Sequence, residues 1–308
     1  MTSTPVETEA RSRTWRPDHP VELAGVLGPL RRGSGDPAFQ STVDGVYWLA
    51  GNTPTGIGTL AVRAAGTVAA SAWGPGADWL LDALPALLGA EDDDTGFVAH
   101  HPLIADTRRR QPGLRLGTTG RVWDVLVSAV LEQKVTGYEA RRSWRELARR
   151  FGTRAPGPAP TGMHVPPDAR AVARIRDWEW HKAGVDGARR RTLIAAASVA
   201  PRLERAATLR GEEGRALLRK VPGIGVWTAA EVAQRAWGDP DAVSVGDLHV
   251  PGVVGWALVG HDLDDDGMLE VLAPYAPQRQ RAVRYIEASG FRRPRFASRY
   301  SVRDYRSF

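Results

Sequence analysis

The stretch that most constrains the fold is 217–247, which reads LLRKVPGIGVWTAAEVAQRAWGDPDAVSVGD. A short helix over 214–220 cannot continue through Pro222-Gly223-Ile224-Gly225, because proline lacks a backbone donor and glycine permits left-handed backbone. The apolar spacing over 226–237 predicts a second helix, which Gly238-Asp239-Pro240 ends. The pattern therefore predicts two helices joined by a tight hairpin, whose exposed amides at a helix N-terminus suit a phosphate.

An aspartate follows this hairpin at a defined spacing, since Asp247 lies 22 positions after Gly225. The hairpin and the spacing resemble the helix-hairpin-helix (HhH-GPD) DNA glycosylase superfamily, whose hairpin reads L-P-G-I-G-x-x-T-A and is followed by a catalytic aspartate. The AlkA-like 3-methyladenine DNA glycosylase branch is the most similar, because Trp227 stands between Gly225 and Thr228 as it does there. Branches that also cut the DNA backbone have a lysine at that position.

The resemblance extends to a second helix, predicted over 122–134 by apolar residues at three- and four-residue spacing. Its end, Glu132-Gln133-Lys134-Val135-Thr136, resembles the family's Gln-Gln-x-Ser signature near the pocket. Gln133 matches the second glutamine, whereas Glu132 departs from the first. Without the resemblance, a glutamine at a helix end is usually just exposed.

The resemblance implies a mainly α fold, a helical HhH-GPD glycosylase domain with a smaller N-terminal α/β domain. It implies a catalytic role for Asp247, although an aspartate after a glycine is also a common helix cap. It implies a base pocket formed by Gln133, Trp227 and Glu231. The DNA contacts that it implies are Lys220, Val221, Gly223, Ile224, Gly225 and Thr228.

The lining of the base pocket departs from the family. AlkA-like relatives have an aromatic residue one helical turn after the hairpin tryptophan, where this chain has Glu231, and a loose alignment puts Glu287 in place of another. Aromatic walls attract cationic alkylated bases. The two glutamates could attract a cationic base, hydrogen-bond a neutral one, or simply face solvent, so the substrate class stays open at this point.

Composition narrows the classes of function. The chain has 308 residues, a net charge of +6 and an estimated pI near 10.0, which favours a polyanionic partner. Of its 41 basic residues only Lys134, Lys182 and Lys220 are lysines, which GC-rich coding explains as readily as phosphate binding does. Cysteine is absent, which excludes disulfides and the iron–sulfur cluster found in some branches of the family.

Four segments are predicted along the chain. Residues 1–20 are polar and are expected to be flexible, and 21–111 contain strand-like runs and an apolar helix, which indicates an α/β domain. Residues 112–290 form the helical HhH glycosylase domain, and 291–308 form an arginine-rich tail with interleaved aromatic residues. Neither a signal peptide nor a membrane span is predicted, so a cytoplasmic, nucleoid-associated monomer is expected.

These features predict a monofunctional DNA glycosylase of base-excision repair that flips damaged, alkylated purines out of duplex DNA and hydrolyses their N-glycosidic bond. No organic cofactor or redox metal is expected. The resemblance implies a monovalent cation at the hairpin. The acidic run at 262–267 mimics a calcium loop, but its twelfth position is Ala273 where glutamate is required. The alternatives are a non-catalytic HhH protein that senses DNA distortion and a glycosylase for deaminated or oxidised bases.

Overall fold

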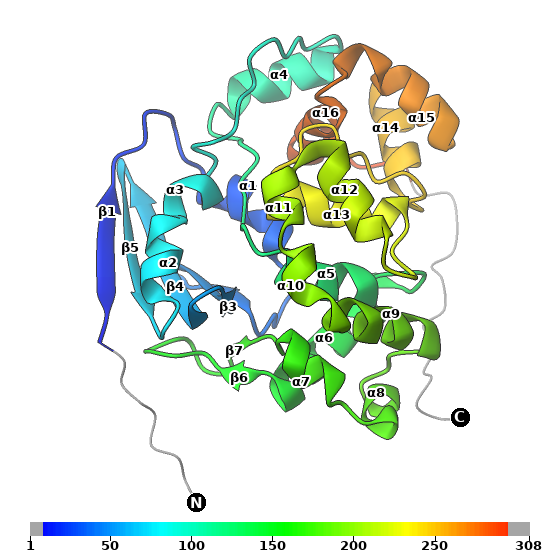
Figure 1. Cartoon of the computed structure of the whole chain (residues 1–308). Helices are drawn as coiled ribbons and strands as arrows, with labels where there is room; N and C mark the ends of the chain where they lie inside the picture. The colour runs from blue at the N-terminus through cyan, green and yellow to red at the C-terminus, as the bar shows by residue number, and fades with distance from the viewer. Residues whose placement is uncertain (1–8, 295–308) are drawn as a thin grey trace, which may run out of the picture.

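The N-terminal part of the protein is a five-stranded antiparallel sheet in the order β1-β5-β4-β3-β2, in a computed structural model that describes residues 9–294 (Figure 1). The central strands β4 and β5 bury Leu60, Val62, Val68 and Ala72 against the covering helices. The elements of this part are β1 (Arg11–Trp15), α1 (Leu23–Leu27), η1 (Gly28–Leu30), β2 (Phe39–Ser41), β3 (Tyr47–Thr53), β4 (Gly56–Ala65), β5 (Thr67–Trp73), α2 (Ala77–Asp82) and α3 (Leu84–Leu87).

The rest of the described chain is almost entirely helical, and its helices form the larger part of the molecule in Figure 1. Its elements are α4 (Pro102–Arg110), α5 (Val122–Leu131), α6 (Gly137–Phe151), β6 (Thr153–Arg154), β7 (His164–Val165), α7 (Ala169–Ala173), α8 (Asp177–Lys182), α9 (Gly187–Ser198), α10 (Ala200–Leu203), α11 (Ala206–Leu209), α12 (Gly211–Arg219), α13 (Val226–Ala236), α14 (Val250–Leu258), α15 (Asp265–Leu272), η2 (Ala273–Tyr275) and α16 (Arg279–Ala288). None of the helices within residues 9–294 has the length and apolarity needed to cross a bilayer.

The first predicted boundary differs from the structure. Residues 11–15, expected to be flexible, form the edge strand β1, which pairs with β5 from Arg11 opposite Ala72 to Trp15 opposite Val68. The sequence RSRTW is mostly polar, so it lacks the apolar alternation of a strand with a buried face. Main-chain pairing and the Arg13 guanidinium, which donates to the Leu81 carbonyl at 2.9 Å, hold it in place.

The second boundary, predicted at residue 111, also differs. Phe97 and Ile104 are buried in one apolar core with Val283 and Ile286 of α16, and α4 packs against α16 rather than against the sheet. Residues from about 97 onward therefore belong structurally to the helical part. The predicted tail, 291–308, lies outside the described residues from position 295, as do residues 1–8.

The central helix α5 is buried along its whole length, as its apolar spacing predicts. Its first turn is fixed by Glu204, which accepts hydrogen bonds from the amides of Val122 and Trp123 at 2.9 and 2.8 Å. Asp124 of the same turn accepts from the Asn52 amide nitrogens of the sheet. Because α13 packs directly along α5, these contacts fix the position of the helical hairpin relative to both parts of the molecule.

Candidate active site

The predicted hairpin connects α12 to α13, and its two glycines do different things. Gly223 has φ +90°, and a Cβ there would lie 1.9 Å from Thr192 Oγ1, so both the backbone and the space require glycine. Gly225 has φ −92° and no atom within 4 Å of a Cβ position. The close approach at Gly223 builds the hairpin, whereas Gly225 leaves its outer surface open.

The N-terminus of α13 is open to an anion. Gly225 is its N-cap residue, and no side chain among the described residues caps the first turn. Pro222, Gly223, Gly225 and Val226 are all exposed. Uncapped amides at the positive end of a helix, next to small exposed residues, form a phosphate-binding arrangement.

The end of α5 is attached to this hairpin through Gln133. Its side-chain nitrogen donates to the Gly223 carbonyl at 3.0 Å and to Thr228 Oγ1 at 2.8 Å. Gln133 therefore holds the hairpin in position, and its amide nitrogen is already committed to that contact.

The predicted DNA contacts divide into two groups. Lys220 is exposed beside the hairpin, with Gly223 and Gly225. The side chains of Val221, Ile224 and Thr228 are buried, so only their backbone atoms could face a ligand. Sequence reasoning located the hairpin but could not separate its outer surface from its inner packing.

Asp247 is oriented by three N–H donors from two elements. Its Oδ1 accepts from the amides of His249 and Val250 at 2.7 and 3.0 Å, and its Oδ2 accepts from the Trp227 indole at 2.9 Å. The preceding Gly246 amide donates to both carboxylate oxygens of Asp265, at 3.0 and 3.1 Å. Asp247 thus caps α14 and also faces the first turn of α13. A role as a helix cap and a role in the site are therefore compatible for this carboxylate.

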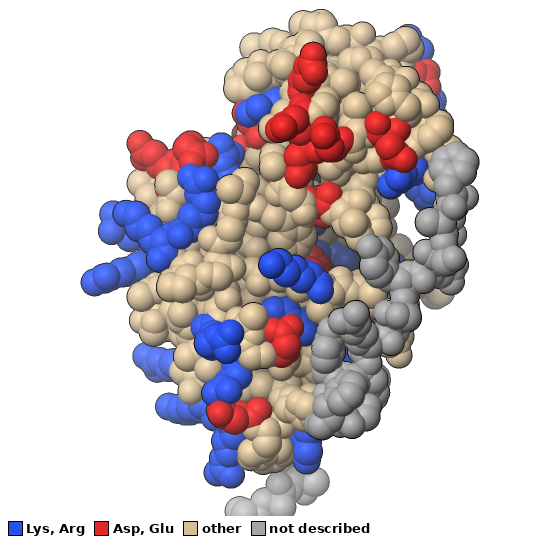
Figure 2. All heavy atoms as spheres, turned by 90° about the vertical axis from the view of Figure 1, so that its right-hand side faces the viewer, with Lys and Arg blue, Asp and Glu red and all other residues tan. Residues whose placement is uncertain are grey.

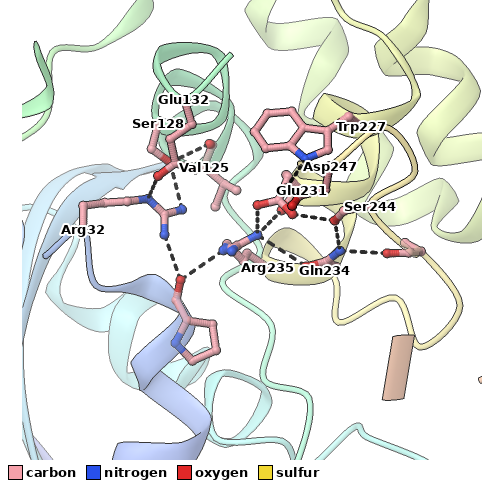
Figure 3. Close-up of polar contacts among 12 residues, drawn as sticks. Arg32, Val125, Ser128, Glu132, Trp227, Glu231, Gln234, Arg235, Ser244 and Asp247 are labelled. Carbon is pink, nitrogen blue, oxygen red and sulfur yellow. Dashed lines mark hydrogen bonds and ion pairs between the residues drawn. The ribbon is translucent and has the colours of Figure 1, made fainter. Parts of the chain in front are cut away.

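One face of α13 presents Trp227, Glu231 and Arg235 at successive turns (Figure 3). The Glu231 carboxylate pairs with the Arg235 guanidinium at 2.8 Å and accepts from Ser244 Oγ at 2.6 Å. The side chains of Glu231 and Arg235 are only 12% and 15% exposed. Both oxygens of Glu231 are therefore used inside the protein, and of the alternatives left open by the sequence, a solvent-facing Glu231 is excluded.

The N-terminal part supplies a second arginine to this region. Arg32 donates to Ser128 Oγ of α5 at 3.0 Å and approaches the Glu132 carboxylate at 3.5 Å. The Pro29 carbonyl accepts from Arg32 at 2.8 Å and from Arg235 at 3.0 Å, which joins the two arginines through one oxygen. We call Arg32, Glu132, Glu231 and Arg235 the charge cluster (Figure 3).

In the charge cluster, nearby carboxylates oppose the effect of burial on the pKa values of the two arginines. Burial by itself lowers the pKa of Arg235, but Glu231, Glu132 and Glu287 together raise it above its ordinary value. For Arg32, burial lowers the pKa and the Glu132 carboxylate opposes that effect. Because arginine starts from a very high pKa, both side chains stay charged.

Solved structures with similar folds include the 8-oxoguanine glycosylase/lyase of Clostridium acetobutylicum, with TM-score 0.71 and 14% identity over 92% of this chain and 98% of that one. The 3-methyladenine DNA glycosylase of Archaeoglobus fulgidus aligns with TM-score 0.71 and 16% identity over 89% of this chain and 96% of that one. The fold is that of the helix-hairpin-helix DNA glycosylases. The predicted fold class is confirmed.

A curated sequence relative is the probable bifunctional transcriptional activator/DNA repair enzyme AlkA of Mycobacterium tuberculosis, which is 31% identical over 169 residues. The match covers 54% of this chain and 32% of that protein, so the chain matches about a third of the relative's length. No family model matches the chain. The resemblance to AlkA-like proteins therefore rests on the shared segment and the common glycosylase fold.

Charge is unevenly distributed on the face of the molecule drawn in Figure 2. Figure 2 shows acidic side chains gathered on the upper part of this face, with Lys and Arg side chains over the lower part. Asp264 is the N-cap of α15, and Asp265 and Asp266 lie in its first turn. A polyanion is therefore attracted to one half of this face of the glycosylase fold and repelled from the other.

Sequence reasoning missed three members of the charge cluster. Arg235 lies four residues after Glu231, a spacing that indicates an ion pair on a helix. Arg32 gave no such signal, because it is 96 positions from Ser128 in the sequence and follows a turn in another part of the fold. Glu132 was noted only as a departure from the family's glutamine.

Proposed function

We propose that the protein is a monofunctional DNA glycosylase that removes alkylated purines from duplex DNA. The observation that carries the proposal is Asp247, whose carboxylate is held between the Trp227 indole and the first turn of α14, beside an uncapped hairpin helix. The 3-methyladenine DNA glycosylase of similar fold and the AlkA relative support this substrate class. The protein would act in the cytoplasm, at the nucleoid.

The hairpin would bind the DNA backbone. Its open amides at the start of α13 suit a phosphate, and Gly225 leaves room for close approach of the strand. The basic lower part of the face drawn in Figure 2 would take the flanking duplex, and the acidic part over α15 would keep phosphates away from the other side. A flipped nucleotide anchored in this way would bring its sugar toward Asp247.

Asp247 would then act on the glycosidic bond. Cleavage of that bond builds positive charge on the sugar, and a fixed carboxylate stabilises the charge and positions the attacking water. The three N–H donors hold the carboxylate in one orientation, so little reorganisation is needed as the charge develops. The base leaves with the bonding electrons, and water supplies the new C1′ oxygen.

Hydrolysis without strand cleavage is favoured by the positions of the lysines. A lyase forms a Schiff base and needs an amine in the pocket. In the branches of the family that are lyases, this hairpin position is a lysine, whereas this chain has Trp227 there. Lys134 and Lys220 are exposed at helix ends, and Lys182 lies 4.6 Å from the centre of the Trp178 ring. The three lysines are therefore placed for surface or phosphate contacts.

The test is release of base from duplexes carrying 7-methylguanine, 3-methyladenine, hypoxanthine or uracil. We expect the wild-type protein to release an alkylated base and to leave an abasic site. Release of hypoxanthine or uracil alone would instead indicate a glycosylase for deaminated bases. Tight binding with no release from any duplex would contradict the proposal and favour a non-catalytic sensor of distorted DNA.

A further inference from the structure

The carboxylates around the candidate site differ in how much hydrogen-bonding capacity they have left. Asp247 uses both oxygens for main-chain and indole donors, and Glu231 uses both for Ser244 and Arg235. Glu287 pairs with Arg284 at 2.5 Å. Glu132 has one ion-pair contact, to Arg32 at 3.5 Å, and no side-chain hydrogen bond to any residue within 9–294. Its side chain is 28% exposed, so Glu132 is a held carboxylate that can still accept hydrogen bonds.

Glu132 is held in place by a rigid support. The Arg32 side chain is 9% exposed, and two of its nitrogens are fixed by the Pro29 carbonyl and by Ser128 Oγ. The third, Nε, is buried without a hydrogen bond and faces Glu132. A buried guanidinium that is otherwise satisfied fixes the carboxylate that balances its charge.

Glu132 lies beside the residues that would form the base pocket. It precedes Gln133, which contacts the hairpin at Gly223 and Thr228. Its charge also raises the pKa of Arg235 on α13, the helix that packs along α5. Figure 3 shows Glu132 at the end of α5 and Trp227 with Glu231 on the neighbouring α13. A base flipped toward Asp247 and Trp227 would enter beside this carboxylate.

We propose that Glu132 is a specificity-determining residue that selects guanine-derived lesions, by accepting hydrogen bonds from the N1–H and 2-amino groups of the flipped base. This assignment rests on the proposed glycosylase function. Guanine and its 7-alkyl derivatives present two adjacent N–H donors on that edge, which match a carboxylate. Adenine and its 3-alkyl derivatives present the N1 lone pair there, which a carboxylate repels.

Alkylation at N7 strengthens this recognition. The positive charge of a 7-alkylated guanine makes its N1–H a better donor, and the same charge is attracted by the carboxylate. A site built to accept from such donors discriminates against a base that lacks them, because the carboxylate is then desolvated without a partner. The Glu132 carboxylate would thus select the base through charge and hydrogen bonds, where aromatic side chains would select it by stacking.

The experiment compares single-turnover release of 7-methylguanine, 7-methylhypoxanthine and 3-methyladenine, each divided by its uncatalysed rate of loss. 7-Methylhypoxanthine differs from 7-methylguanine only in lacking the 2-amino group. We expect the wild type to favour 7-methylguanine over 7-methylhypoxanthine by about 10- to 100-fold, and to favour it over 3-methyladenine as well. Glu132→Gln should reduce both preferences to within about 3-fold, whereas Glu231→Gln should leave the ratios between bases unchanged whatever its effect on rate.

Three results would overturn the assignment. One is a wild-type protein that does not distinguish 7-methylguanine from 7-methylhypoxanthine, a comparison that needs no variant to fold. Another is a Glu132→Gln protein, with a thermal melting temperature near that of wild type, that keeps the wild-type preference. A wild type that releases none of the three bases would instead overturn the proposed function, and the assignment with it.

Discussion

The hairpin with Asp247 and the charge cluster both contact the helix α13, but they are built in different ways. The hairpin is made of main-chain atoms from one continuous stretch, with Gly223 against Thr192 and an open helix end at Gly225. The charge cluster is made of side chains from the loop after η1, from α5 and from α13. Main-chain geometry suits any phosphate, whereas placed side chains can distinguish one base from another.

The difference indicates a division of labour. Contacts made by glycines and amides depend on a local stretch of sequence, so the hairpin is set by residues 222–226 and their neighbours. The charge cluster depends on the packing of the N-terminal sheet domain against the helices, because Pro29 and Arg32 come from that domain. The N-terminal part would thereby shape the proposed base pocket.

The largest effect is expected at Asp247. Asp247→Asn keeps the size of the side chain and an oxygen that can accept from the α14 amides, but removes the charge that stabilises the sugar cation. The rate of base release should fall by about 10²- to 10³-fold. Single-turnover rates, with circular dichroism as the control for folding, would measure this. A rate within about 3-fold of wild type would show that the chemistry does not depend on this carboxylate.

The next largest effect is expected from breaking the pair on α13. Arg235→Met leaves Glu231 partly buried without its partner and should lower the free energy of unfolding by about 3 kcal/mol. The double variant Glu231→Leu, Arg235→Met removes both charges and should recover much of that loss. Urea denaturation of the two proteins would test this. If the double variant were less stable than the single one, the pair would not be the source of the stability.

The two glycines of the hairpin give a matched comparison. Gly223→Ala forces a methyl group against Thr192 at positive φ and should cost about 1 to 3 kcal/mol of stability. Gly225→Ala meets open space, so its stability should change by less than about 0.5 kcal/mol. Its methyl group should still weaken duplex binding by obstructing the phosphate. Thermal melting and fluorescence anisotropy would separate the effects, and equal loss of stability in both would contradict the geometry.

The smallest effect is expected in the pH dependence of stability that comes from Glu204, which accepts hydrogen bonds from the first turn of α5. Burial raises the pKa of Glu204 above its ordinary value of 4.5, although the amides of Trp123 and Val122 oppose this. A carboxyl with a raised pKa in the fold binds its proton more tightly there, so its contribution to stability falls as pH rises from below 4.5 through the folded pKa. Glu204→Gln should therefore show a weaker decline of melting temperature with rising pH. An unchanged slope would assign the decline to other groups, such as Asp124, whose pKa is also raised by burial.

The sequence predicted the parts of the site that depend on neighbouring residues. The hairpin, the buried helix α5 and the placement of Asp247 near Trp227 follow from glycine and proline punctuation, apolar spacing and the family resemblance. The strand at Arg11–Trp15 and the packing of α4 on α16 did not, because neither has a local pattern that reveals its partner. The hydrogen bond from Ser244 to Glu231 and the ion pair of Glu132 with Arg32 were hidden for the same reason, since Ser244 and Arg32 approach from other elements.

The most direct test of the central claim counts the products of one turnover on a duplex with a single 7-methylguanine. Hydrolysis assisted by Asp247 predicts one free base and one abasic site per event, with the strand intact until alkali is added and no protein–DNA adduct after borohydride treatment. Strand cleavage without alkali, together with a borohydride-trapped adduct, would show a lysine-dependent lyase. Failure to release any base while the duplex is bound would show that the hairpin binds DNA without a reaction.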